Sequence, residues 1–270
     1  MSGSYKNEAT VTSGTHGRFI WYEAMTTDTK AAEAFYRSVV GWGAQDAGMP
    51  NMAYTLLTVG DVPVAGLMEI PERAKSAGAR PGWIGHVSVD DVDQTAARFE
   101  REGGTIYKAP EDIPGVGRFA VVADPHGAVI ALFKAGPDTK MPTPDAPGTP
   151  GQTGWRELHA GDREADFNFY AGVFGWTKGD AIDMGPMGVY QLLAKDGETF
   201  GGMMTKTETT PAPFWLYYFN VDDIDAAIDR VRAGGGQVLN GPLQVPGGSW
   251  IAQCRDPDGG MFALVAPQRS

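Results

Sequence analysis

The sequence is short of positive charge, has a single cysteine and contains no long apolar run. It holds 22 Lys and Arg residues against 33 Asp and Glu residues, which gives a formal net charge of −11. Nucleic-acid backbones and anionic membrane surfaces bind basic patches, so this balance argues against both as partners. Cys254 is the only cysteine. It cannot form an intramolecular disulfide, which favours an intracellular or redox-indifferent setting.

The lack of a long apolar run bears on location. Residues 1–16 are polar and have no apolar segment of the signal-peptide type, so we interpret them as a flexible leader. Apolar runs such as 129–133 are far too short to cross a bilayer. We therefore expect a cytoplasmic protein.

What the sequence does contain is a duplication. The segment from Trp21 to Trp42 returns, at matching spacing, between Trp155 and Trp176. Each copy has a Trp-x-Glu strand, a helical stretch with a Phe-Tyr pair, and a closing Gly-Trp pair. An Asp-Pro-x-Gly turn at 124–127 likewise returns near the end of the chain. Order, spacing and turn type repeat together, so the chain consists of two similar modules.

The module boundaries follow from composition. Residues 136–153 are rich in Pro, Gly and Thr and almost free of large apolar residues, which is typical of a linker. We therefore assign residues 17–135 to module 1 and residues 154–270 to module 2.

Module 1 contains the same order of elements twice. A strand at 19–25 precedes a helix that Asp28 can cap, and a hairpin at 54–68 follows. A strand at 83–89 then precedes a helix that begins at Asp91, and three strands follow up to residue 133. This pattern predicts two βαβββ units in each module and an α+β fold.

These motifs resemble the vicinal oxygen chelate superfamily, which includes glyoxalases, bleomycin-resistance proteins and extradiol dioxygenases, and in particular its fused two-module branch. The resemblance implies that each module forms a cup-shaped, partly open mixed sheet. It also implies a divalent metal held by His or Glu at four inward strand positions. Counted from the motifs, these positions fall on Trp21, Gly66, Ile84 and Ala131 in module 1 and on Trp155, Gly202, Leu216 and Ala263 in module 2. Because none of these side chains is a metal ligand, we predict no metal ion and no other cofactor.

Strand alternation predicts which polar groups face each cup. If Trp21 points inward, Glu23 does too, and the next strand adds His86. In module 2 the corresponding groups are Glu157 and His159. A partly desolvated glutamate and an imidazole can transfer protons near neutral pH, so these four residues are the candidate catalytic groups. The alternative is that the glutamates only accept hydrogen bonds inside a filled barrel.

Aromatic and apolar side chains are the candidate ligand contacts. They are Trp21, Trp155, Tyr54, Tyr190, Tyr218, Phe133 and Met261. The tryptophans can stack on a planar ligand or simply fill the core, and the tyrosines can orient a ligand or simply pack. His126, in the first Asp-Pro-x-Gly turn, is expected to be solvated.

Three functions are compatible with these residues. We favour a metal-free, glyoxalase-like protein that binds a small apolar or aromatic metabolite in its cups. The second is an enzyme of the lyase, isomerase or dioxygenase-like type, which would use Glu/His acid–base chemistry or a relocated divalent metal. The third is a structural or partner-binding scaffold with filled cups. In each case we expect a monomeric pseudo-dimer, and for the first two the partner is a small molecule.

Overall fold

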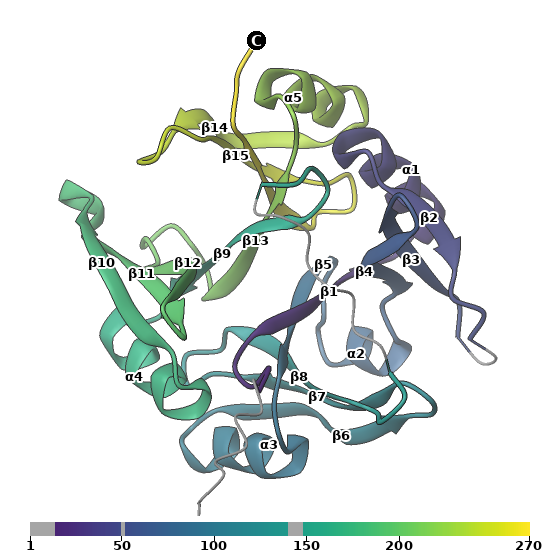
Figure 1. Ribbon diagram of the computed structural model, residues 1–270, viewed down its shortest axis with the longest axis vertical. Coiled ribbons are helices and arrows are strands. Elements are labelled where there is room, and N and C mark those ends of the chain that lie inside the picture. The colour runs from purple at the N-terminus through teal and green to yellow at the C-terminus, as the bar shows by residue number, and fades with distance from the viewer. Residues whose placement is uncertain (1–13, 50–51, 140–147) are drawn as a thin grey trace, which may run out of the picture.

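The computed structural model describes residues 14–49, 52–139 and 148–270. Most of the expected leader and the central part of the expected linker therefore lie outside the described residues. The strands form two eight-stranded mixed sheets, one from each module (Figure 1). This architecture confirms the α+β fold and the tandem duplication.

The sheet of module 1 has the order β2-β3-β4-β1-β5-β8-β7-β6. Its strands are β1 (Phe19–Thr26), β2 (Gly43–Asp46), β3 (Tyr54–Val59), β4 (Val62–Glu69), β5 (Gly82–Ser88), β6 (Thr105–Ile113), β7 (Gly117–Ala123) and β8 (Val129–Ala135). The first βαβββ unit supplies β1 to β4 and the second supplies β5 to β8. They join where β1 pairs with β5 antiparallel.

The sheet of module 2 repeats this order as β10-β11-β12-β9-β13-β16-β15-β14. Its strands are β9 (Thr153–Ala160), β10 (Thr177–Asp183), β11 (Val189–Lys195), β12 (Glu198–Thr205), β13 (Phe214–Asn220), β14 (Gln237–Gln244), β15 (Trp250–Arg255) and β16 (Met261–Ala266). Each sheet is built from one module alone, so each cup forms within a module and not between the two.

The long helices begin at aspartate caps, as expected. The Asp28 side chain accepts a hydrogen bond from the backbone N–H of Ala31, and Gly41, with φ of 89°, ends the helix in the left-handed region. The helices are α1 (Thr29–Val40), α2 (Glu72–Ser76), α3 (Val92–Arg101), α4 (Arg163–Phe174) and α5 (Ile224–Ala233), with a 3-10 turn at Gly185–Met187. The short α2 was not predicted. None of the helices within the described ranges has the length and apolar character that a membrane span requires.

The side chains of β1 separate into two environments. Tyr22 and Ala24 are buried in the large apolar core, whereas Trp21 and Glu23, which point to the opposite face, are partly exposed. We call this second face the cup of each module: cup 1 is marked by Trp21 and Glu23, and cup 2 by the corresponding tryptophan and glutamate of β9.

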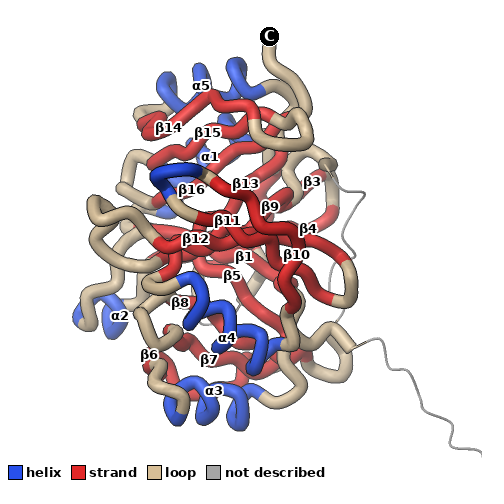
Figure 2. Tube along the Cα trace, turned by 90° about the vertical axis from the view of Figure 1, so that its left-hand side faces the viewer, coloured by secondary structure: helices blue, strands red, loops and turns tan. Residues whose placement is uncertain are grey.

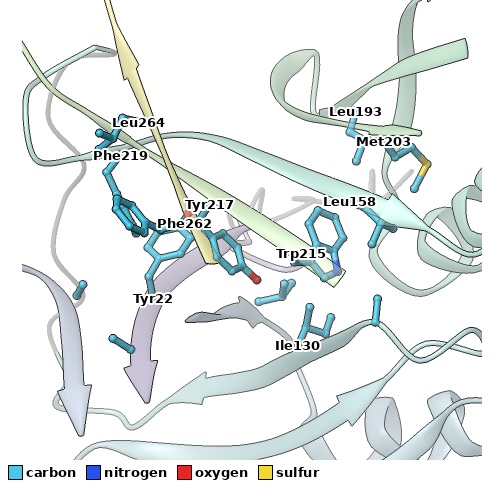
Figure 3. Packing of buried hydrophobic residues seen from close by; sticks show 14 of the residues in the cluster. Tyr22, Ile130, Leu158, Leu193, Met203, Trp215, Tyr217, Phe219, Phe262 and Leu264 are labelled. Atoms are coloured by element: carbon cyan, nitrogen blue, oxygen red, sulfur yellow. The ribbon is translucent and has the colours of Figure 1, made fainter. Parts of the chain in front are cut away.

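The faces of the two sheets that point away from the cups pack against each other (Figure 2). At their centre the rings of Tyr22 and Tyr217 meet edge to face, with centroids 5.3 Å apart. The Tyr217 hydroxyl also accepts a hydrogen bond from the backbone N–H of Gly85 in module 1, at 2.8 Å. Figure 3 shows these two tyrosines in the middle of the packed apolar side chains.

The repeated Phe-Tyr motif holds the two modules together. The Tyr36 hydroxyl in α1 donates to Asp256 in the Asp-Pro-x-Gly turn of module 2, at 2.7 Å. Tyr170 in α4 makes the reciprocal bond to Asp124 of module 1, at 3.0 Å. In agreement, α1 lies beside α5 of the other module (Figure 1).

His126 is exposed, as expected, with 38% of its side-chain surface accessible, but its ring also contacts module 2. Its Nδ1 bonds to Asp166 of α4, a residue that is only 1% exposed. This hydrogen bond to Asp166 raises the pKa of His126. The turn of module 1 therefore contacts module 2, which no pattern inside a single module reveals.

Candidate functional site

Cup 1 contains a chain of three hydrogen-bonded side chains. The indole N–H of Trp21 donates to the Tyr54 hydroxyl at 2.9 Å, and that hydroxyl donates to the Glu23 carboxylate at 2.9 Å. Gly66 lies beside Glu23 on the neighbouring strand. A Cβ at Gly66 would overlap the Tyr54 ring, so this glycine makes room for the tyrosine.

Cup 2 contains the same chain. Trp155 donates to Tyr190 at 2.8 Å, and Tyr190 donates to Glu157 at 2.8 Å. Gly202 pairs with Glu157 and would overlap the Tyr190 ring if it carried a Cβ. The two tyrosines that we expected as ligand contacts therefore also position the glutamates.

The four positions at which the resembled family would hold a metal lie together on each inner face. In cup 1 they carry Trp21, Gly66, Ile84 and Ala131. The indole offers only an N–H donor, and the other three side chains have no polar atom. Cup 2 repeats this with Trp155, Gly202, Leu216 and Ala263. In the described part of the chain, no group of three or more His, Cys, Asp or Glu residues could hold a metal ion. The residues at these positions do not fit a divalent metal.

In cup 2 the glutamate is fully occupied by partners from its own module. Glu157 is 7% exposed. Tyr190 donates to one carboxylate oxygen, and Tyr218 donates to the other at 3.0 Å. Nε2 of His159 lies 2.9 Å from that second oxygen, and the Gln253 amide donates to it at 3.2 Å. The structure thus brings Glu157 and His159 together, inside a closed network.

Gln253 was missed by the sequence reasoning. It lies on β15 and pairs with Ala263 on β16, so its side chain shares the cup face. Its amide also donates to the Tyr218 hydroxyl at 2.9 Å. Extending strand alternation to β15 would have identified it.

In cup 1 the matching positions carry different side chains. His86 pairs with Ala131 as Tyr218 does with Ala263, and Val121 occupies the position of Gln253. Met25 stands where module 2 has His159. Valine and methionine cannot donate a hydrogen bond, and no hydrogen bond joins His86 to Glu23. Within the part of the chain that the structure describes, the glutamate of cup 1 therefore accepts one side-chain hydrogen bond, from Tyr54.

Among the described residues, cup 1 has one buried polar atom without a partner and one glutamate with a single side-chain partner. His86 is 7% exposed, and its Nε2 has no hydrogen-bond partner within the described residues. Burial lowers the pKa of His86 to about 4, so its ring is neutral at pH 7. Burial raises the pKa of Glu23 to about 7, although part of the residue is accessible to solvent, and the Tyr54 hydrogen bond acts in the opposite direction.

The apolar candidates lie on the same faces. The Phe133 ring is 7% exposed and lies 6.3 Å from the His86 ring, edge to face. In cup 2, Tyr218 belongs to a small apolar cluster separate from the main core, and Met261 and Trp155 pack against it. Every candidate site residue therefore faces its cup, but only cup 2 joins a glutamate to an imidazole.

Comparisons with known proteins identify relatives of both modules. The model of the glyoxalase/bleomycin resistance protein/dioxygenase superfamily matches residues 18–132 and 154–264. CFP32 of Mycobacterium tuberculosis, which is named as a glyoxylase, is 30% identical over 92% of this chain and 94% of its own. The anthracycline biosynthesis protein DauV of Streptomyces sp. is 30% identical over 91% of each chain. Among solved structures, a Mn(II)-bound glyoxalase from Novosphingobium aromaticivorans superposes with a TM-score of 0.64 at 17% identity, over 93% of this chain and 82% of that one. At that identity the likeness concerns the fold.

Proposed function

The chain belongs to the glyoxalase/bleomycin resistance protein/dioxygenase superfamily, and from this membership we propose that it binds a small apolar or aromatic molecule in its cups, without a metal at the family's usual position. The observation that carries the proposal is the composition of cup 1. Trp21 and Tyr54 lie beside Glu23, and Phe133 lies further along the same face, against His86. One oxygen of the Glu23 carboxylate accepts no hydrogen bond from the described residues. Aromatic walls around a few convergent polar groups are typical of small-molecule sites.

The donor set supports the metal-free part of the proposal. Divalent cations need several nitrogen or oxygen ligands that converge on one point. The family's four positions supply none in either module, and Glu23 of cup 1 has an isoleucine and a glycine as its strand neighbours. A relocated metal would need a ligand cluster that the described residues do not contain.

Calorimetric titration of the whole chain with a panel of planar aromatic and apolar metabolites tests the proposal. We expect binding with a Kd in the micromolar range, typical of a site that buries a small ligand, and we expect the same affinity in EDTA. Elemental analysis of protein purified without chelators is the companion measurement. Stoichiometric retained metal, or binding that EDTA abolishes, would contradict the metal-free site. If no compound of the panel gives a binding signal, ligand binding is contradicted.

The raised pKa of Glu23 favours a second candidate function, that of an acid–base enzyme. A carboxyl group that titrates near neutral pH can both accept and return a proton at physiological pH. Glu23→Gln should then lower the turnover of an identified substrate by about 10²-fold or more. Glu157→Gln is the matched variant, since its carboxylate is occupied by module 2 side chains and should matter far less. Equal turnover by Glu23→Gln and the wild type would exclude proton transfer by Glu23.

The packing of the two modules also bears on assembly. The faces of the two sheets that a single module would leave apolar already cover each other, from Phe19 and Tyr22 on one side to Trp215 and Tyr217 on the other. We therefore propose that the protein is a monomer. We also propose a cytoplasmic location, which fits the net negative charge and the single buried cysteine. Sedimentation velocity at micromolar concentration tests the monomeric state, and a dimer would contradict it.

A further inference from the structure

Cup 2 shows which side chains can hydrogen-bond to a glutamate at this position of the sheet. The Tyr218 phenol reaches Glu157 from the neighbouring strand, and its hydroxyl donates to the carboxylate at 3.0 Å. Tyr218 and His86 occupy the same register position, because each pairs with the cup tryptophan on one side and with an alanine on the other. Cup 2 therefore carries a built-in phenol where cup 1 carries an imidazole.

The imidazole of His86 does not replace this phenol. It is shorter than a tyrosine side chain, makes no hydrogen bond to Glu23, and leaves its own Nε2 buried without a partner. A buried polar atom without a partner is costly and therefore uncommon in folded proteins. Glu23 and His86 are diagonal neighbours on adjacent antiparallel strands, where side chains lie about 7 Å apart at their Cβ atoms.

A hydroxyl group matches both unsatisfied groups. It can donate to the carboxylate of Glu23 and exchange a second hydrogen bond with the neutral imidazole of His86. A carboxylate ligand would instead place two negative charges together whenever Glu23 is ionised.

Cup 1 is also less filled at one edge. In cup 2 the Phe214 ring stacks on His159, with centroids 4.5 Å apart and the planes 6° from parallel. The corresponding pair across the strands in cup 1 is Gly82 with Met25. Glycine leaves uncovered the area that a phenylalanine ring covers in module 2.

From these differences we infer that cup 1 alone takes the ligand, and that the ligand is an uncharged aromatic compound with a hydroxyl group that donates to Glu23, as the Tyr218 hydroxyl donates to Glu157 in cup 2. This inference rests on the proposed binding function and narrows it to one module and one chemical class. Cup 2 is occupied by its own tyrosine, glutamine and histidine.

Titration calorimetry of the whole chain with 2-naphthol and naphthalene tests the chemical class. We expect 2-naphthol to bind at one site per chain and about tenfold or more tighter than naphthalene, as a hydrogen bond to a charged or polarised group predicts. In Glu23→Leu the two probes should bind with equal affinity. Equal binding of both probes to the wild type would overturn the hydroxyl assignment and leave the broader binding function standing.

The His86→Tyr variant tests the module assignment, because it gives cup 1 the phenol of cup 2. It should lose 2-naphthol binding by about tenfold or more, with its folding checked by circular dichroism. Gln253→Val is the matched control in module 2, and we expect its 2-naphthol affinity to equal that of the wild type, since two tyrosines still bond Glu157. Two sites per chain, or binding that a folded His86→Tyr retains, would overturn the assignment to cup 1. Failure of every aromatic probe would instead refute the proposed binding function.

Discussion

Cup 1 and cup 2 share one scaffold but treat the same glutamate in different ways. Glu157 is bonded by Tyr190, Tyr218, His159 and Gln253. Among the described residues, Tyr54 alone bonds the Glu23 side chain. The two sheets have the same strand order and the same Trp-Tyr-Glu chain. The difference arises from three side chains around the glutamate, and it separates a position that supports the fold from one that is available to a ligand.

The tyrosine–aspartate contacts between the modules show no such difference. Tyr36 bonds Asp256 and Tyr170 bonds Asp124, and each tyrosine also accepts an indole N–H, from Trp83 and Trp215 respectively. The pseudo-symmetry of the duplication is therefore retained at these two tyrosines and lost around the glutamates of the cups. Equivalent substitutions in the two modules should therefore have unequal effects in the cups and equal effects at these tyrosines.

The largest expected effect concerns stability and separates the two glutamates. Glu157→Leu leaves several buried donors without an acceptor, so we expect it to lower the free energy of unfolding by about 3 kcal/mol. Glu23→Leu removes one hydrogen bond and a partly desolvated carboxyl group, so we expect a change below about 1 kcal/mol. Urea denaturation at pH 7 measures both. Equal losses in the free energy of unfolding would show that the two glutamates contribute equally to stability.

The two tyrosines at the module interface should instead respond equally. Tyr36→Phe and Tyr170→Phe each remove a buried hydroxyl that bonds both a carboxylate and an indole. We expect each to lower the free energy of unfolding by about 2 kcal/mol. Tyr107→Phe is the control, because Tyr107 is 55% exposed and should have almost no effect. A loss of stability at only one of the two interface tyrosines would show that the two contacts are not equivalent.

A third effect is a pH dependence of stability that arises from Glu23 in cup 1. The pKa of Glu23 is raised from 4.5 in the unfolded chain to about 7 in the folded protein, so the folded state binds this proton more tightly. Its contribution to stability is therefore complete below pH 4.5 and is lost as the pH rises to about 7. Because the residue is partly exposed, we expect roughly 1 to 2 kcal/mol.

The pH effect is measured as the free energy of unfolding of the wild type minus that of Glu23→Gln, between pH 5 and pH 8. This difference cancels the other titrating groups, including His126. A difference that does not vary with pH would mean that Glu23 titrates normally, and it would remove the basis of the acid–base candidate.

The smallest effect comes from His126, which has no histidine counterpart in module 2. Its pKa is raised by the hydrogen bond to Asp166, so it adds stability below about pH 6.5, and this contribution is lost as the pH rises through the folded-state pKa. The side chain is 38% exposed, so His126→Ala should cost less than about 1 kcal/mol at pH 6 and still less at pH 8. Equal costs at both pH values would argue against a charged pair.

The sequence was sufficient for the fold and for the orientation of the strand side chains. The repeated motifs identified two βαβββ units per module, and the period of two along β1 placed Trp21 and Glu23 on one face. Both inferences depend on local spacing, which a sequence records directly. The same spacing located the four positions at which the family holds a metal, and the sequence alone shows which residues occupy them.

The contrast between the cups could not be predicted in this way. Glu23 with His86 and Glu157 with His159 look equivalent as residue pairs, yet His159 lies on the same strand as its glutamate and His86 lies on the neighbouring one. Whether a side chain reaches its partner depends on distances across strands and on bulges such as those in the pairing of β14 with β15. The His126 contact was missed for a related reason, since it crosses between modules.

A crystal structure of the protein with 6-bromo-2-naphthol, in which the anomalous signal locates the bromine, tests the difference between the cups most directly. The difference between the cups predicts one bromine peak per chain, in cup 1 beside Trp21 and Phe133, with the naphthol oxygen within hydrogen-bond distance of Glu23. A peak in cup 2, near Trp155 and Tyr218, or equal peaks in both cups, would show that ligand binding is not confined to cup 1.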